Sequence, residues 1–238
     1  MTLRVKKFLS LRGDGNMAYY AGKGREKAQE NRYRFFENLG ISLERSVFLK
    51  QIHGTKSTLV RKEDIGRGSK SHENALLDTD AIITDIFDVA LVVQIADCVP
   101  ILFFEDNFGF IGAIHSGWRG TLQNITGKTI ENAVKTYGLN RDVIKVWIGP
   151  SVRGCCFEVD ERIVYPVRER GFLGLSENES HWDIAKACKG QLENIGILSK
   201  HIEMTKECTV CTGEKFFSYK REGETAGRIL AGIYMTKE

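Results

Sequence analysis

Three apolar runs follow one another in the middle of the 238-residue chain, at Val89 to Val93, Ile101 to Phe104 and Phe108 to Ile114. The first is continuous and rich in valine, which is typical of a strand covered on both faces. The second and third are separated by Glu105-Asp106-Asn107, whose residue types favour a hairpin turn. Strands therefore follow strands without a helix between them, a pattern that favours a mixed α+β sandwich over a doubly wound parallel sheet.

Helical patterns flank these strands. The stretch from Arg25 to Leu39 has an apolar face and ends before Gly40, and the stretch from Thr121 to Tyr137 ends before Gly138. Glycine is favoured after a helix because it readily adopts positive φ. With no internal repeat or linker, the chain is expected to form one domain over residues 1–238. We also expect helices at Glu161 to Arg170 and Ile184 to Ile195, and strands at Ser46 to Gln51, Asp80 to Thr84, Val143 to Ile148 and Lys215 to Tyr219.

Charge and hydropathy exclude several classes of protein. The net charge is only +3, from 34 Lys plus Arg against 31 Asp plus Glu, so a nucleic-acid-binding protein with a clustered basic face is not expected. No segment approaches the roughly 20 apolar residues of a membrane span. The opening residues lack the apolar region of a secretory signal, so we predict a cytoplasmic protein whose six cysteines are reduced thiols or ligands.

Three potential metal ligands share one context at the ends of predicted strands. His53 precedes Gly54, Cys98 lies two residues before Pro100, and His115 ends the third apolar run. Taken singly, each residue has a simple structural explanation, such as a buried thiol or a histidine that satisfies a backbone group. Together, two imidazoles and a thiolate match a catalytic zinc site with an open fourth position, whereas structural zinc normally has four protein ligands.

The segment His115-Ser116-Gly117-Trp118-Arg119-Gly120 adds a possible anion site. It lies between a predicted strand and the helix predicted from Thr121, so backbone N–H groups and Arg119 can converge there. Such an arrangement suits a phosphate or a carboxylate. The simpler interpretation is that Trp118 packs in the core and Arg119 is a surface charge.

Other cysteine and histidine residues match metal motifs less well. Cys208-Thr209-Val210-Cys211 after His201-Ile202-Glu203 superficially resembles the signature of zinc nucleoside deaminases. Only four residues separate Glu203 from Cys208, too few for the intervening strand and turn, so we reject that match. Cys155 and Cys156 are adjacent, so we do not expect both to bind one tetrahedral metal; core or pocket-lining positions are expected instead. His72 is expected to be solvated in a polar loop.

Several segments together resemble the YfiH-like, laccase-domain family, whose members are known variously as multicopper polyphenol oxidoreductases and purine nucleoside phosphorylases. The matching segments keep the family's order over most of the chain from Asn31-Arg32 onward. They are Gln51-Ile52-His53-Gly54, Asp80 to Thr84, Ala96-Asp97-Cys98-Val99-Pro100, His115 to Gly120, Ile148-Gly149-Pro150, Cys155-Cys156-Phe157-Glu158-Val159, Cys208-Thr209 and Phe217 to Arg221.

The resemblance implies an α+β sandwich that binds zinc through His53, Cys98 and His115. It implies phosphorolysis of adenosine, inosine and methylthioadenosine to a free base and a sugar 1-phosphate, with adenosine deamination as a further activity. Nucleoside and phosphate would be the partners, with neither nucleic acid nor a membrane involved. Under this hypothesis Arg119 holds phosphate, Arg32 is a second candidate for that role, and Asp97 orients a ligand or acts as a base.

Two departures from the family pattern limit what can be carried over. Leu9 to Tyr20 fits the family's Gly- and Ser-rich opening poorly, so no site residue is taken from it. Lys220 stands where Arg is usual, which weakens that position as a bidentate anion clamp.

The name multicopper oxidoreductase does not fit the histidine content of this chain. A laccase needs one mononuclear and one trinuclear copper centre, mostly ligated by His, and the chain has five His in total. Copper can occupy a His-Cys-His set in vitro, so polyphenol oxidase activity would be secondary.

Two alternatives remain open. Cys98 could be a nucleophile activated by His115 or His53, which would make the protein an amidase or a hydrolase that edits peptidoglycan precursors. The protein could also be a regulatory or scaffold protein with a purely structural zinc.

Overall fold

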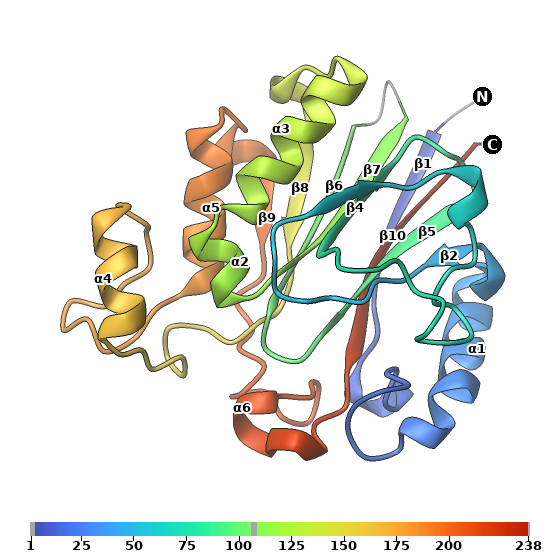
Figure 1. Cartoon of the computed structure of the whole chain (residues 1–238), viewed down its shortest axis with the longest axis horizontal. Helices are drawn as coiled ribbons and strands as arrows, with labels where there is room; N and C mark the ends of the chain where they lie inside the picture. The colour runs from blue at the N-terminus through green and yellow to red at the C-terminus, as the bar shows by residue number, and fades with distance from the viewer. Residues whose placement is uncertain (1–2, 106–108, 238) are drawn as a thin grey trace.

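The computed structural model describes residues 3–105 and 109–237, which form two stacked sheets with helices on the outside (Figure 1). The smaller sheet has the strand order β1-β10-β5-β2. The central strand β10 pairs antiparallel with both β1 and β5, while the short β2 runs parallel to β5. The strands are β1 (Leu3–Leu9), β2 (Ser46–Val47), β5 (Val89–Ile95) and β10 (Ile229–Lys237).

The larger sheet has six strands in the order β3-β4-β7-β6-β8-β9. Its centre is antiparallel, and a parallel strand is added at each edge. The strands are β3 (Ser57–Leu59), β4 (Ala81–Thr84), β6 (Val99–Glu105), β7 (Phe110–Ser116), β8 (Lys145–Ile148) and β9 (Ile202–Met204).

Helices cover the outer face of each sheet (Figure 1). Helix α1 (Ala28–Leu39) packs Phe35 and Phe36 onto the smaller sheet. Helices α3 (Ile125–Tyr137) and α5 (Ile184–Asn194) pack on the larger sheet. The remaining helices are α2 (Trp118–Leu122), α4 (Glu161–Glu169) and α6 (Tyr219–Glu222). The expected mixed α+β sandwich is confirmed.

Strand β5 explains why the two sheets stack. Its side chains alternate, so that Val89, Leu91 and Val93 join the apolar core between the sheets. Ala90 and Val92 point the other way, into the core beneath α1. All of these residues are fully buried, as predicted for a strand covered on both faces.

Several expected elements differ from the structure. The helix expected over Thr121 to Tyr137 is broken into α2 and α3, because Asn124 has φ 61° and its side chain caps the new helix by accepting from the Gly127 N–H. The strand expected over Ser46 to Gln51 is limited to β2. No strand forms at Lys215 to Tyr219, where α6 begins instead. Of the turn expected at Glu105-Asp106-Asn107, the last two residues lie outside the described ranges.

No helix in the described parts of the chain combines the length and apolar character needed to cross a bilayer.

Candidate metal centre and substrate cavity

Strand register places the three predicted ligands at one edge of the larger sheet. Strands β6 and β7 pair antiparallel with Pro100 opposite His115, so the residue just before β6, Cys98, lies near the end of β7. Strand β4 pairs with the other side of β7, and the His115 N–H donates to the Asp80 carbonyl at 2.7 Å. The loop that follows β2 brings His53 to the same edge through backbone bonds to the Asp80 carboxylate.

His53, Cys98 and His115 form a compact set of donor atoms. One ligating atom from each residue lies within 4.8 Å of the others. The two imidazole rings meet edge to face, with centroids 4.9 Å apart. His115 is buried, Cys98 is half-buried and His53 is exposed, so the set is anchored in the protein and opens toward solvent through His53. The structure therefore brings together the three residues singled out in the sequence.

The Asp80 carboxylate organises this set. It is fully buried, and one of its oxygens lies 2.8 Å from His115 Nδ1. Because an ionised carboxylate only accepts, Nδ1 carries the proton and Nε2 is left available as a ligand. The same carboxylate accepts from the backbone N–H groups of Ile52, His53 and Gly54, at 3.2, 3.0 and 2.8 Å.

Backbone conformation at the site is equally constrained. His53 has φ 60°, a left-handed conformation that a non-glycine residue adopts only with support, here from Asp80. Gly117 must be glycine for a different reason. A Cβ atom there would lie 2.7 Å from His53 Cδ2 and 3.2 Å from Cys98 Sγ. The strand-to-helix turn thus comes into contact with the donor set only because it has no side chain.

The residues of the donor set shift one another's pKa values. Burial raises the pKa of the Cys98 thiol, but His115 and His53 outweigh it and lower that pKa to about 6. Burial lowers the pKa of His115, but Cys98 and Asp80 outweigh it and raise that pKa to about 9. The metal-free site therefore favours a thiolate beside an imidazolium at neutral pH.

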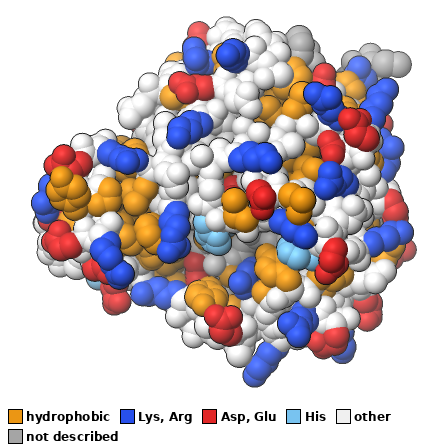
Figure 2. Space-filling model, in the orientation of Figure 1, with side chains coloured by type: hydrophobic (Ala, Val, Ile, Leu, Met, Phe, Trp, Pro, Cys, Tyr) orange, Lys and Arg blue, Asp and Glu red, His pale blue; other side chains and the backbone are white. Residues whose placement is uncertain are grey.

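A cavity of about 500 Å³ opens over these donors. That volume is within the usual range for small-molecule sites. Aromatic side chains, cationic side chains and the metal-ligand set all line it, and on the face drawn in Figure 2 histidine surface is exposed among basic and hydrophobic side chains. The aromatic residues are Tyr20, Trp118, Phe157 and Tyr219, and the cationic residues are Arg119, Lys220 and Arg228.

Arg119 lies where the sequence placed it, at the cavity beside the start of α2. Its guanidinium stacks on the Trp118 ring with Cζ 4.1 Å from the ring centroid, and the side chain is exposed. Lys220 also lines the cavity, and its Nζ lies 3.4 Å from Glu158 Oε2. Both cations are therefore available at the cavity surface for an anionic ligand.

Arg32 does not line the cavity. It is 1% exposed and sandwiched between the rings of Tyr19 and Phe48. Its guanidinium donates to the carbonyls of Met17, Gly68 and Ser69, and to the Gln94 side chain. The expectation that Arg32 contacts phosphate is corrected, because its donors are occupied by the protein itself.

Asp97 lines the cavity, but both oxygens of its carboxylate accept hydrogen bonds from other residues of the protein. It accepts from Thr209 Oγ1 at 2.6 Å and from the Lys220 N–H at 2.7 Å, and its own backbone has φ 86°. The Asp97 carbonyl accepts from the Val152 N–H at 2.9 Å. These bonds tie the loop that carries Cys98 to three distant segments, at Val152, Thr209 and Lys220, so the Asp97 carboxylate is less suited to act as a base.

Sequence reasoning missed three contributors. Asp80 was treated as the start of a strand, although an acidic residue directly before a buried strand is itself a signal. Tyr20 lies in the stretch from which no site residue was taken, and Arg228 was not considered at all. His72, expected to be solvated, is half-buried with its ring 4.3 Å from that of Tyr20.

Comparisons with known proteins identify the family of the chain. Residues 10–236 match the model of a family described as multi-copper polyphenol oxidoreductase laccase. The chain is 34% identical over 230 residues to the purine nucleoside phosphorylase YlmD of Geobacillus stearothermophilus, covering 94% of this chain and 84% of that protein. It is 28% identical over 246 residues to adenosine deaminase RL5 from an unknown prokaryotic organism, covering 97% and 94%.

Solved structures of similar proteins share this fold. The crystal structure of YlmD from Geobacillus stearothermophilus superposes with a TM-score of 0.92 at 31% identity, covering 98% of this chain and 92% of that one. The crystal structure of the Bacillus licheniformis hypothetical protein YfiH superposes with a TM-score of 0.91 at 26% identity, covering 98% and 93%.

Proposed function

Because the chain belongs to the multi-copper polyphenol oxidoreductase laccase family, we propose that it is a zinc-dependent purine nucleoside phosphorylase. Its substrates would be adenosine, inosine and methylthioadenosine, which phosphate cleaves to the free base and the ribose or methylthioribose 1-phosphate. One observation carries the proposal. A single cavity combines the His-Cys-His set with aromatic side chains that can stack on a purine and with cationic side chains that can bind phosphate.

The residues present fit a zinc ion. Two imidazoles and a thiolate are ligands that Zn²⁺ prefers, and the Asp80–His115 pair is the carboxylate–histidine arrangement that fixes a ligand's tautomer. His53, Cys98 and His115 would hold the ion. When bound, it supplies Lewis acidity to a substrate oxygen or to a water molecule.

The chain's own residues account for the rest of the reaction. In phosphorolysis a phosphate oxygen forms a bond to the anomeric carbon while the bond from that carbon to the base nitrogen breaks. The electron pair of the broken bond stays on the base, which gains a proton. Arg119 and Arg228 bind and orient the phosphate dianion, and Trp118 and Phe157 stack on the purine.

Adenosine deamination is a second candidate activity, favoured by the relative named adenosine deaminase. In this reaction water replaces the amino group of the purine, giving inosine and ammonia. The same cavity would bind the base, but no phosphate would be consumed. The two activities are therefore separable by their products.

Copper oxidase chemistry is less compatible with the described residues. The chain has five His, and only His53 and His115 belong to the donor set. A four-copper laccase centre cannot be assembled from that set, so any polyphenol oxidation would follow adventitious loading of copper.

A cysteine hydrolase is the enzyme alternative that the geometry keeps open. Cys98, His115 and Asp80 form a nucleophile, base and orienter in hydrogen-bonded sequence. Such a triad leaves no role for His53 as a donor, whereas a metal site uses all three residues. We therefore favour the metal.

The Cys98→Ala variant tests the assignment. We expect it to lose nucleoside turnover and the metal held by the His-Cys-His set, while its circular dichroism spectrum and melting behaviour remain close to those of the parent. Full activity in this variant would remove the site from the mechanism. A collapse of the fold on chelation, with no turnover of any nucleoside by the parent, would instead indicate a scaffold protein with structural zinc.

A further inference from the structure

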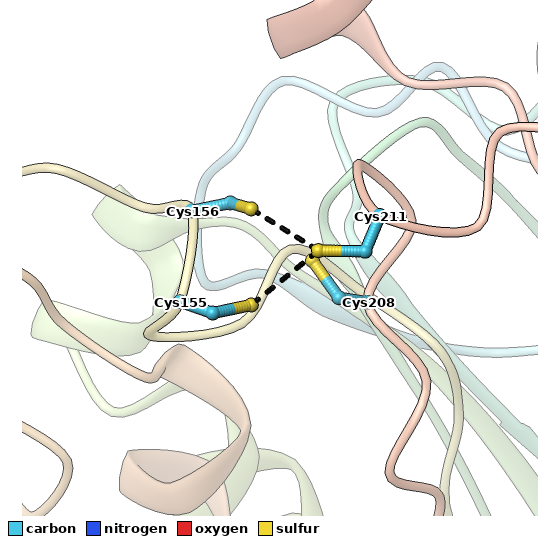
Figure 3. Close-up of side chains that lie close together, drawn as sticks. All are labelled: Cys155, Cys156, Cys208 and Cys211. Carbon is cyan, nitrogen blue, oxygen red and sulfur yellow. Dashed lines mark hydrogen bonds between the residues drawn. The ribbon is translucent and has the colours of Figure 1, made fainter.

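Four of the six cysteines gather at a second position, outside the substrate cavity. Cys155 and Cys156 come from the loop after β8, and Cys208 and Cys211 from the loop after β9 (Figure 3). All four sulfur atoms lie within 4.8 Å of one another. Cys211 Sγ is 3.7 Å from Cys155 Sγ and 3.4 Å from Cys156 Sγ. Cys155 and Cys156, which were not expected to bind one metal, both lie close enough to the same two sulfurs to do so.

The sulfur spacing matches ligands around a common ion. Four sulfurs placed tetrahedrally at about 2.3 Å from Zn²⁺ are separated from one another by about 3.8 Å. A disulfide requires a sulfur separation of about 2.05 Å. Cys208 and Cys211 have the two-residue separation that is common in zinc knuckles. The cluster thus has the ligand type, the number and the spacing of a closed zinc site.

Backbone structure brings both pairs to this point. Cys208 forms an isolated parallel bridge with Ser151, and the Thr209 N–H donates to the Ser151 carbonyl at 3.0 Å. The loop after β9 then turns, with the Thr212 N–H donating to the Cys208 carbonyl at 3.0 Å. The other loop turns in the same way, with the Cys156 N–H donating to the Arg153 carbonyl at 2.9 Å. The two turns face each other across the bridge.

The surroundings suit a cluster of negative charge. Four thiolates and one Zn²⁺ carry a net charge of −2. Arg221 supports the loop after β9 directly, donating to the carbonyls of Thr209 and Val210 at 2.7 and 2.9 Å. Lys206 shares a smaller cavity with Cys155, where Arg153 is already paired with Asp183 at 3.0 Å. The Lys206 ammonium group near the sulfurs would partly balance that charge.

Exposure argues against a simpler role in packing. Cys155 and Cys211 are exposed and Cys156 is half-buried, so only Cys208 of the four lies in the interior. The core positions expected for Cys155 and Cys156 are therefore not found, although Cys155 does line the smaller cavity. Thiols at accessible positions contribute little to packing, so three of them in contact with a fourth, buried thiol call for a ligand.

We propose that Cys155, Cys156, Cys208 and Cys211 form a second, tetrathiolate Zn²⁺ site that is separate from the His-Cys-His set. With four protein ligands it leaves no open position for substrate, so its role is structural. Binding replaces the thiol protons with the metal, and those protons are released to solvent.

This site would hold two walls of the substrate cavity together. Val152 and Phe157, on either side of the first cysteine pair, both line that cavity. Thr209, within the second pair's loop, donates to Asp97 beside Cys98. A metal that joins the two loops therefore fixes both the purine-facing wall and the loop that carries Cys98. The inference stands on the cysteine geometry and does not depend on the proposed function.

Metal analysis of the full-length protein, purified under reducing conditions with zinc in the growth medium, tests the site. We expect two zinc ions per chain in the parent, one in Cys211→Ser and one in Cys98→Ser. Cys188→Ser is the matched control, because Cys188 is a buried free thiol that belongs to neither set, and it should keep two. One zinc in the parent and in Cys211→Ser alike would overturn the proposal, as would a disulfide found by intact mass under these conditions.

Cobalt substitution keeps the proposal testable if Cys211→Ser fails to fold. Cys98→Ser retains all four thiols of the cluster but lacks a ligand of the first site. Titrating it with Co²⁺ should give the intense visible bands and the near-ultraviolet sulfur-to-cobalt charge transfer of a tetrahedral thiolate site, saturating at one equivalent. A folded Cys98→Ser protein that gives no such spectrum would refute the second site.

Discussion

The buried Asp80 carboxylate lies 2.8 Å from His115 Nδ1 and also accepts the backbone N–H of His53. One carboxylate therefore sets the tautomer of one ligand and the loop conformation of another. Asp80 directly precedes strand β4, and the pairing of β4 with β7 fixes its position beside His115. A substitution of Asp80 therefore tests how far the metal ligands depend on the residues that hold them in place.

Asp80→Asn should weaken zinc binding by about 10- to 100-fold, since an amide cannot accept from all of these donors as strongly as a carboxylate. Competition with a chromogenic chelator measures the zinc affinity. Asp85→Asn, the same change at an exposed position just after β4, is the control and should bind as the parent does. Equal affinities in the two variants would mean that Asp80 does not support the metal ligands.

Gly117→Ala should disturb the donor set, because the added methyl would lie 2.7 Å from His53 Cδ2. A displacement of about 1 Å at a reacting centre costs roughly 100-fold in rate, so we expect kcat/KM for inosine to fall by about that factor. Gly13→Ala is the matched control, since a methyl there meets nothing within 4 Å. Parent-like kinetics for Gly117→Ala would contradict the geometry described for this turn.

Cys98 should be unusually reactive once metal is removed. Its pKa is lowered to about 6, so the thiolate predominates above that pH and becomes protonated below it. In chelator-treated protein, iodoacetamide should alkylate Cys98 readily at pH 7 and much more slowly at pH 5. Added zinc should protect it at both pH values. If zinc offered no protection at pH 7, the cysteine hydrolase would become the better account; peptide mapping by mass spectrometry assigns the modified residue.

Arg119→Ala should raise KM for phosphate by about 10- to 100-fold while KM for inosine changes little, because a charge-assisted hydrogen bond contributes about 1.5–3 kcal/mol. Arg119→Lys should recover part of this loss, since it keeps the charge without the planar guanidinium. Arg162→Ala, which removes an exposed arginine from α4, is the control. A parallel rise in both KM values for Arg119→Ala would indicate a role in cavity shape instead.

Arg32→Met should lower the free energy of unfolding by about 3 kcal/mol, because the carbonyls that it bonds would lose their donors inside the protein. KM for phosphate should be unchanged at temperatures where the variant is folded. Urea denaturation and steady-state kinetics measure the two effects. A stable variant with a raised KM for phosphate would restore Arg32 as a phosphate ligand.

The fold and the donor set were predictable where a local pattern determined them. The continuous, valine-rich run from Val89 to Val93 was typical of a doubly covered strand and is one. Cys98 and His115 flank apolar runs that pair antiparallel, so their convergence follows from topology. Arg32 was misjudged although a signal was present. Residues Ala28, Asn31, Arg32, Phe35 and Phe36 have the spacing of one helical face, and all are buried on α1.

Other features depend on contacts that sequence spacing does not specify. Lys215 to Tyr219 has apolar residues suited to a strand, but strand formation requires a partner, and here Ser218 caps α6 instead. Cys155 and Cys156 were not expected to bind one metal because they are adjacent in the sequence, and adjacent residues in a strand point to opposite sides. They lie in a turn, where that alternation does not hold, and the bridge between Ser151 and Cys208 joins segments more than 50 residues apart.

The most direct test of the central claim is an assay of metal-analysed protein on adenosine and inosine, with and without phosphate. We expect zinc-loaded protein to release free base and ribose 1-phosphate from inosine only when phosphate is present. Ammonia release from adenosine in either condition would reveal deamination alongside it. Fully zinc-loaded protein that shows no phosphate-dependent cleavage of either nucleoside would contradict the account, and would direct attention to hydrolysis of an amide or a cell-wall precursor.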